Sequence, residues 1–287
     1  MRTAVLGSGG QLGRALAVLL PGAVPLDFSD LDITDAAATS RFNWSEFDLV
    51  INTAAYTAVD MAETPGGRVA AWRVNAVGVA NLARAVRDHD LTLVHISSEY
   101  VFDGRVPGPI PEDAPFSPLS AYGASKAAGD VAAALCSSYY IVRTTWMIGE
   151  GSNFVRTMLS LAAQGATPRV VADQIGRPTF AEDLASGIVA LTTSGPAFGT
   201  YNITNSGDPA SWAEVARATF ELAGRSRDDV ADTTTADYFA TRPDAARRPL
   251  NSILDLRKAA GAGVHLPPWR DSLAAYVAKE RSTSSAG

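Results

Sequence analysis

Short apolar runs alternate with longer amphipathic stretches through the first half of the chain. Strand-like runs, each followed by a stretch with helical periodicity, lie at residues 3–6, 48–52, 91–97 and 139–144. Parallel neighbouring strands need crossover connections, and these are usually helices. The pattern therefore predicts an α/β fold with a doubly wound parallel sheet over residues 1–145.

The second half of the chain is less regular, with loops rich in Gly, Pro and Ser. Its candidate elements are helices at 152–163, 182–193 and 211–223 and strands at 169–171 and 200–204. They predict a smaller, interleaved lobe over residues 146–280 that binds the substrate and sends some segments back to the first domain. The polar string "RSTSSAG" predicts a disordered tail at residues 281–287.

Composition and charge narrow the function classes. A chain of 287 residues with 47% hydrophobic residues can bury a sizeable core. It has no apolar run long enough to cross a membrane and no signal-like start, so we expect a cytoplasmic protein without a membrane partner. A net charge of −6 with scattered arginines argues against a nucleic-acid partner. The single cysteine, Cys136, excludes an internal disulfide, and the spacing of the three histidines predicts no metal site.

A glycine-rich turn, "GSGGQLG", follows the first strand and opens a helix. Gly7 would permit the tight turn, Gly10 close approach of the backbone to a pyrophosphate, and Gly13 close packing of the helix on the strand. The spacing is one residue longer than GxGxxG. Its position in the first βαβ unit still predicts a Rossmann-type dinucleotide site.

Asp27 follows a second strand candidate, at the distance where a carboxylate can bind an adenosine ribose. A solvated turn aspartate is the alternative. No arginine follows Asp27 directly to take a 2′-phosphate, although Ser29 could contact one. The cofactor is therefore expected to be NADPH or NADH, without a choice between them.

Candidate catalytic residues come from two later segments. In "SAYGASK", Tyr122 and Lys126 are four residues apart and share one face of a predicted helix. A nearby ammonium should lower the pKa of the phenol, which could then give a proton to a developing alkoxide. Ser98 ends the strand candidate at 91–97, where the carboxyl ends of parallel strands line a ligand crevice. A serine that caps local backbone is the alternative for Ser98.

Several strings together resemble one enzyme family. They are "DLVINTAAYTAVDMAE", "HISSEYVFDG", "YGASKAAGD", "VRTTWMIGEGSNFVRTML", "DQIGRPT" and "ARRPLNSILD". The chain is similar, over nearly its whole length, to the dTDP-4-dehydrorhamnose reductases of the extended short-chain dehydrogenase/reductase superfamily. This resemblance implies NAD(P)H-dependent reduction of the 4-keto group of a dTDP-4-dehydro-6-deoxy-L-hexose, in rhamnose or antibiotic deoxysugar biosynthesis.

The resemblance also implies roles for single residues, with Tyr122 as proton donor and Lys126 as its electrostatic partner, both beside the cofactor. The implied cofactor contacts are Gly10, Gln11 and Leu12 at the pyrophosphate, Asp27 at the ribose, Asp32 and Ile33 near the adenine, and Ala54, Ala55 and Tyr56 along the cofactor. The implied substrate contacts are Ser98, Glu99, Trp146 on the sugar, and Arg177, Arg247 and Arg248 near the nucleotide diphosphate.

Two departures from the family pattern affect these expectations. The usual Ser-Thr-Asp-Tyr-Val-Phe reads Ser-Ser-Glu-Tyr-Val-Phe here, so Ser98 keeps a hydroxyl while the Glu99 carboxylate is one methylene longer. We expect the chemistry to survive and the sugar specificity to shift. A glutamate that some relatives use in a metal-bridged dimer has no counterpart at Arg14 or Ala15, so we expect neither that metal nor that dimer. Monomer and homodimer both stay open.

Alternatives remain for residues and for function. Arg143 and Trp146 leave a strand and could simply cover its end. An epimerase or dehydratase of the same superfamily is the nearest rival, although a dehydratase would carry an adjacent Asp and Glu where this chain has Ser98 and Glu99. A non-catalytic regulatory subunit is a third reading, against which the intact Tyr122 and Lys126 argue. The sequence does not choose the sugar or the C4 configuration of the product.

Overall fold

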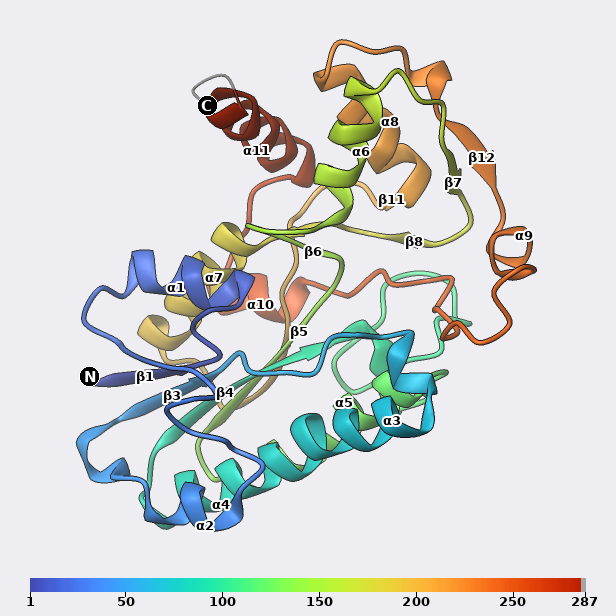
Figure 1. Cartoon of the computed structure of the whole chain (residues 1–287). Coiled ribbons are helices and arrows are strands. Elements are labelled where there is room, and N and C mark those ends of the chain that lie inside the picture. The colour runs from blue at the N-terminus through green and yellow to red at the C-terminus, as the bar shows by residue number, and fades with distance from the viewer. Residues whose placement is uncertain (285–287) are drawn as a thin grey trace.

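The computed structural model describes residues 1–284 and has a six-stranded sheet at its centre (Figure 1). All neighbouring strands are parallel, in the order β2-β1-β3-β4-β5-β10. The strands are β1 (Thr3–Leu6), β2 (Val24–Leu26), β3 (Leu49–Asn52), β4 (Thr92–Ser98), β5 (Tyr139–Thr144) and β10 (Gly199–Asn202). The predicted α/β fold with a parallel sheet is confirmed.

Helices cover both faces of the sheet (Figure 1). One face carries α1 (Gln11–Leu19), α7 (Ala181–Ser194) and α10 (Arg257–Gly261), and the other carries α2 (Ala36–Arg41), α4 (Val79–Asp88) and α5 (Ala121–Ala133). Helix α3 (Pro65–Trp72) packs against α5. Within β1, Ala4 and Leu6 pack into the α4 layer while Val5 packs into the α1 and α7 layer. Burial on both faces explains why the strands read as unbroken apolar runs.

Further segments form a smaller part of the molecule above the sheet in Figure 1. Its strand pairs are β6 (Met147–Ile148) with β9 (Thr179–Phe180), β7 (Arg169–Val171) with β12 (Ala231–Thr233), and β8 (Ile175–Gly176) with β11 (Ala210–Ser211). Its helices are α6 (Phe154–Ala163), α8 (Trp212–Leu222), α9 (Thr235–Phe239) and α11 (Trp269–Ser284). The domain boundary at residue 145 stays a prediction, while α7, β10 and α10 pack with the sheet.

Short helical turns complete the chain. They are η1 (Trp44–Glu46), η2 (Met61–Glu63), η4 (Glu99–Val101) and η5 (Arg227–Asp229), with a π-helical turn, η3 (Arg73–Gly78), between α3 and α4. Such π turns often occur at functional sites. Here η3 places the buried side chain of Asn75 between Tyr56 and α5, where it bonds both Tyr56 and Ser125.

The predicted disordered tail is wrong for its first four residues. Helix α11 continues to Ser284, and the Arg281 Nη1 donates to the Leu222 carbonyl oxygen at 2.9 Å. This bond to the end of α8 anchors the last turns of the helix, which the polar composition alone did not indicate. Residues 285–287 lie outside the described residues.

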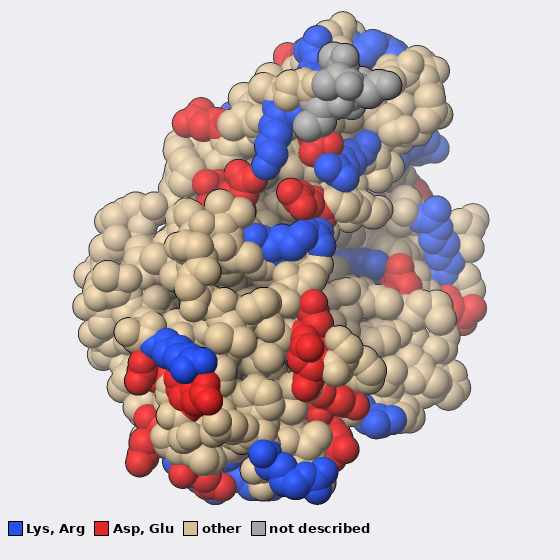
Figure 2. Space-filling model, turned by 60° about the vertical axis from the view of Figure 1, so that its left-hand side comes forward, with Lys and Arg blue, Asp and Glu red and all other residues tan. Residues whose placement is uncertain are grey.

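Basic and acidic side chains are interspersed over the face shown in Figure 2. Within residues 1–284, no helix is both long and apolar enough to cross a membrane.

A buried ion pair fastens α5 to the sheet. Arg143, on β5, donates its Nε to the Asp130 Oδ2 on α5 at 3.0 Å and its Nη1 to the Glu112 carbonyl oxygen at 2.8 Å. The guanidinium also lies 5.1 Å and 5.2 Å from the ring centres of Phe102 and Phe116. Only 3% of the Arg143 surface is exposed. Arg143 therefore packs over the end of the strand, which is the structural alternative that the sequence left open for it.

We predict that Arg143→Ala lowers the free energy of unfolding by about 3–5 kcal/mol, because it leaves the Asp130 carboxylate buried without its partner. Urea unfolding of purified protein measures the change. Arg227→Ala is the matched control, since it removes an exposed ion pair with Glu221 and should cost less than about 1 kcal/mol. Equal losses in the two variants would contradict a special role for the buried pair.

Candidate active site

A cleft of about 930 Å³ opens at the carboxyl ends of β1, β3, β4 and β5. Most of the residues selected from the sequence line it: Gly7, Gly10, Gln11, Leu12, Asp27, Asp32, Ile33, Ala54, Ala55, Ser98, Glu99, Tyr122, Lys126 and Trp146. Gly13, Tyr56, Arg177, Arg247 and Arg248 are not among its lining residues. The structure thus brings the cofactor and catalytic candidates together and leaves the three arginines outside the wall of the cleft.

The glycine turn holds the end of β1 close to the end of β3. Gly7 has a φ of +73°, and a Cβ added to it would lie 2.7 Å from the Ala54 backbone nitrogen. A Cβ on Gly13 would lie 2.4 Å from the Gly7 carbonyl oxygen, so α1 packs directly on the turn. Gly10 precedes α1 and has no side chain to cover the first amides of the helix. The turn therefore suits a bound pyrophosphate.

Asp27 faces the glycine turn from the end of β2. Its Oδ1 accepts a hydrogen bond from the Gly9 amide at 2.9 Å, which fixes the carboxylate at the edge of the cleft. Leu31 and Ile33 supply buried apolar wall beside it. An acidic group next to an apolar pocket suits an adenosine. The carboxylate can bind the ribose, and the aliphatic side chains can pack against the adenine base.

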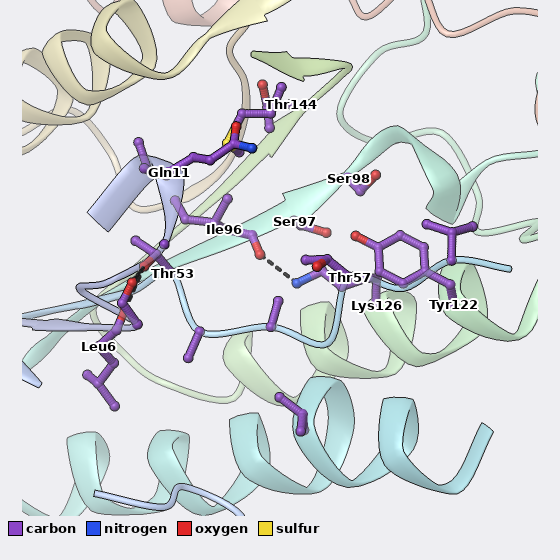
Figure 3. A pocket seen from close by; sticks show the side chains of 18 of the residues that line it. Leu6, Gln11, Thr53, Thr57, Ile96, Ser97, Ser98, Tyr122, Lys126 and Thr144 are labelled. Atoms are coloured by element: carbon purple, nitrogen blue, oxygen red, sulfur yellow. Dashed lines mark hydrogen bonds between the residues drawn. The ribbon is translucent and has the colours of Figure 1, made fainter. Parts of the chain in front are cut away.

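The catalytic candidates converge from α5 and β4 (Figure 3). Tyr122 and Lys126 are 8% and 2% exposed, and the Lys126 Nζ donates to the Ile96 carbonyl oxygen at 2.6 Å. Ser120 caps α5 by accepting from the Gly123 amide at 3.1 Å, which starts the helix just before Tyr122. Ser98 accepts from the Tyr100 amide at 3.3 Å, so it caps local backbone while its side chain lines the cleft.

Burial shifts the two α5 groups in opposite directions. Burial raises the pKa of the Tyr122 phenol, and the nearby Glu99 carboxylate raises it further. Burial lowers the pKa of Lys126 to about 8. The predicted lowering of the phenol pKa is therefore wrong for this structure, because loss of water and the neighbouring Glu99 carboxylate both raise it. At neutral pH Tyr122 keeps its proton, which is the form that a proton donor needs.

Glu99 is a carboxyl group enclosed in the protein. It is 2% exposed, and burial raises its pKa to about 7, although a hydrogen bond from Ser98 acts in the opposite direction. The Ser98 Oγ donates to the Glu99 Oε2 at 2.7 Å. The Glu99 side chain is thus turned towards Ser98, and the two residues that differ from the family pattern bond each other in the wall of the cleft.

Two tryptophans form an aromatic wall of the cleft. The rings of Trp146 and Trp212 stack with centroids 3.9 Å apart and planes 17° apart. Trp146 has a φ of +44°, a conformation that costs a residue with a side chain roughly 1–3 kcal/mol and persists where packing enforces it. Gly176 provides the space that the Trp146 ring occupies, since a Cβ on Gly176 would lie 3.0 Å from that ring. Sequence reasoning missed Trp212, whose only local signal is an aromatic residue after the Ser211 cap.

Two of the three predicted substrate arginines bond other groups of the protein. Arg177 donates to the carbonyl oxygens of Gly207 and Leu254, at 2.8 Å and 3.2 Å, and lines a separate cavity of about 360 Å³. Arg248 pairs with Asp60, and Arg247 is exposed. A role for any of them at the nucleotide diphosphate stays a prediction.

Arg14 is a further cleft residue that the sequence did not select. It donates its Nε to the Glu150 Oε2 at 3.0 Å and its Nη2 to the Glu150 carbonyl oxygen at 3.1 Å. These bonds connect the start of α1 to the loop after β6, beside the cleft. In the described part of the chain, no group of three or more His, Cys, Asp or Glu side chains could hold a metal ion.

Comparison with known proteins gives concordant matches. The family model described as "RmlD substrate binding domain" matches residues 1–282. A dTDP-4-dehydrorhamnose reductase of Aggregatibacter actinomycetemcomitans is 40% identical and covers 95% of this chain and 97% of its own. A dTDP-4-keto-6-deoxy-D-glucose reductase of Streptomyces niveus is 42% identical over 78% of this chain and 79% of its own. The structure of a Bacillus anthracis dTDP-4-dehydrorhamnose reductase with NADP superimposes with a TM-score of 0.87 at 35% identity, covering 95% and 96% of the two chains.

The buried Glu99 predicts a pH-dependent stability difference. The unfolded chain releases this proton near the ordinary pKa of 4.5, whereas the folded chain holds it to about 7, so the folded state loses stability as the pH rises between these values. Glu99→Gln has no proton to lose. Relative to the parent protein, its free energy of unfolding should therefore gain about 2–3 kcal/mol between pH 5 and pH 8.

Urea unfolding at the two pH values measures this gain. Glu46→Gln is the control, because Glu46 is an exposed partner of Arg2 and its replacement should change stability by less than about 1 kcal/mol at either pH. A Glu99→Gln effect of equal size at pH 5 and pH 8 would show that Glu99 is ionised in the folded protein throughout.

Proposed function

Because the chain belongs to the family of dTDP-4-dehydrorhamnose reductases, we propose that it reduces the 4-keto group of a dTDP-linked 4-keto-6-deoxy sugar with NADPH or NADH. It is an NAD(P)H-dependent ketoreductase of deoxysugar biosynthesis. The observation that carries this function is the single cleft in which a dinucleotide turn and the Tyr122, Lys126 and Ser98 side chains face one another.

The cofactor would lie along the carboxyl ends of the strands. Gly10, Gln11 and Leu12 would contact its pyrophosphate through the start of α1, and Asp27 would bind its ribose. The bound nicotinamide supplies a hydride. The related Bacillus anthracis enzyme holds NADP, and the carboxylate of Asp27 suits the free hydroxyls of NADH, so both cofactors belong in the assay.

Tyr122 is the proposed proton donor. Its buried, protonated phenol would give its proton to the C4 oxygen as negative charge develops there, and the Lys126 ammonium would stabilise the phenolate that remains. Ser98 lies at the same end of the cleft and would donate its hydroxyl to the ketone oxygen after turning from Glu99. Placement of these donors would account for much of the rate gain.

The rival functions have less support from the site. A dehydratase needs an acidic group where this chain has the Ser98 hydroxyl, and a non-catalytic subunit has no need for Tyr122 and Lys126 in one buried cleft. A cytoplasmic location and a monomeric or homodimeric state stay predictions from the sequence.

We predict that Tyr122→Phe lowers kcat by about 10²-fold or more while the affinity for reduced cofactor is unchanged, because only the transferable proton is lost. Steady-state assays and a cofactor fluorescence titration measure the two effects. Tyr139→Phe is the control, since Tyr139 begins β5, at the end of the strand away from the cleft, and packs into the α4 layer. Turnover at the parent rate in Tyr122→Phe would remove Tyr122 from the mechanism.

The substrate assignment has its own test. Purified protein is given a panel of dTDP-4-keto-6-deoxy sugars with NADH or NADPH, the absorbance of the reduced nicotinamide is followed, and the C4 configuration of each product is determined. We expect stoichiometric cofactor oxidation with at least one sugar. Conversion of a sugar without net cofactor consumption would instead identify an epimerase.

A further inference from the structure

Asp60 anchors a segment that lies far from it in the sequence. Its Oδ1 accepts hydrogen bonds from the Ala246 amide at 3.0 Å and from the Arg248 Nη1 at 2.5 Å. The Arg248 Nη1 also donates to the Ala246 carbonyl oxygen. Asp60 precedes η2 in the first half of the chain, so these bonds hold segment 246–248 of the second half against the sheet-bearing part.

The Arg248 guanidinium also interacts with two aromatic residues. It lies 5.1 Å from the ring centre of Phe239, at the end of α9, and interacts with the Tyr100 hydroxyl. Its side chain is only 19% exposed. Arg248 therefore joins Asp60, α9 and Tyr100 in one cluster, and its position depends on each of them.

Tyr100 in turn packs against the catalytic phenol. The rings of Tyr100 and Tyr122 meet edge to face, with centroids 5.4 Å apart and planes 85° apart, and both line the cleft. The Tyr100 backbone is equally close, since a Cβ on Gly123 would lie 2.2 Å from the Tyr100 carbonyl oxygen. Tyr100 is thus wedged against α5 at the residue after Tyr122, and a shift of Tyr100 must alter the place of Tyr122.

We propose that Tyr100 is a positioning residue for Tyr122, and that the Asp60–Arg248 pair sets the place of Tyr100. Segment 246–248 then completes the catalytic site from the second half of the chain without lining the cleft itself. The inference rests on the proposed function, in which Tyr122 gives the proton. It assigns Arg248 a role different from the diphosphate contact that the family resemblance implies.

The two roles of Arg248 predict different kinetics. A diphosphate ligand acts on substrate and transition state alike, so its loss raises KM for the sugar nucleotide and leaves kcat unchanged. A residue that positions Tyr122 acts on the reacting geometry, so its loss lowers kcat. Displacement of a reacting group by about 1 Å can cost on the order of 100-fold in rate.

The test compares Arg248→Ala, Tyr100→Phe and the double variant in the full-length protein. Each single change should lower kcat about 10- to 100-fold with KM for the cofactor unchanged. The double variant should lose no more than the larger single loss, because both changes break the same chain of contacts. Asp60→Asn keeps an acceptor oxygen for the Ala246 amide and should lose less kcat than Asp60→Ala.

Arg242→Ala is the matched control. It removes a positive charge from the chain shortly before segment 246–248. Arg242 lies 4.1 Å from the ring centre of Tyr238, and its charge helps to lower the pKa of Asp60, but no hydrogen bond between Arg242 and Asp60 is among the described contacts. Its kcat should equal that of the parent. A rise of sugar-nucleotide KM at constant kcat in Arg248→Ala, or losses that multiply in the double variant, would overturn the inference.

Crystal structures separate this inference from the proposed function. If the parent protein reduces no sugar of the panel, the proposed function fails, and the ring geometry still decides the positioning role. In Arg248→Ala we expect the Tyr100 ring to leave its edge-to-face contact with Tyr122. An unchanged ring pair in that variant would refute the positioning role whatever the activity.

Discussion

The docking of α5 on the sheet is the constraint on which the site depends. Lys126 and Asp130 are four residues apart on the buried face of this helix, where Lys126 bonds the Ile96 carbonyl oxygen and Asp130 binds Arg143. His95 adds to the same layer as a neutral ring, because burial and the neighbouring Lys126 hold its pKa well below the usual value. The polar cluster behind the helix fixes its rotation, and that rotation presents Tyr122 to the cleft.

Burial of this layer also sets the protonation states that the proposed chemistry needs. The same loss of water that raises the pKa of Tyr122 lowers that of Lys126 to about 8. Near pH 7 the phenol therefore carries its proton while the amine is still mostly charged. A protonated phenol and a charged amine can coexist in the cleft near pH 7, because burial favours the neutral phenol and the pKa of Lys126, although lowered, stays above 7.

Local patterns predicted the glycine turn and the Tyr122–Lys126 face of the cleft, and long-range contacts decided the rest. The strands, Gly7, Gly13 and the Tyr122–Lys126 spacing follow from periodicity and turn geometry within a few residues. Two contacts join segments that are far apart in the sequence: Trp146 stacks on Trp212, and Arg248 bonds Asp60. No local sequence pattern predicts such contacts. The direction of the phenol pKa was mispredicted because spacing gives proximity but not the extent of desolvation.

This division has a consequence for how substrate specificity can change. The glycine-turn end of the cleft is built from backbone amides and glycines, and an added Cβ at Gly7 or Gly13 would collide with backbone atoms. This packing constrains the sequence of the turn without selecting among substrates. The opposite end, where the proposed sugar would lie, is built from side chains that contact one another, with Ser98 on Glu99 and Trp146 on Trp212. A one-methylene change at Glu99 can move the bonding partner of Ser98 while the glycine turn stays as it is. Variation in sugar preference is therefore expected to concentrate in these side-chain pairs, with cofactor binding preserved.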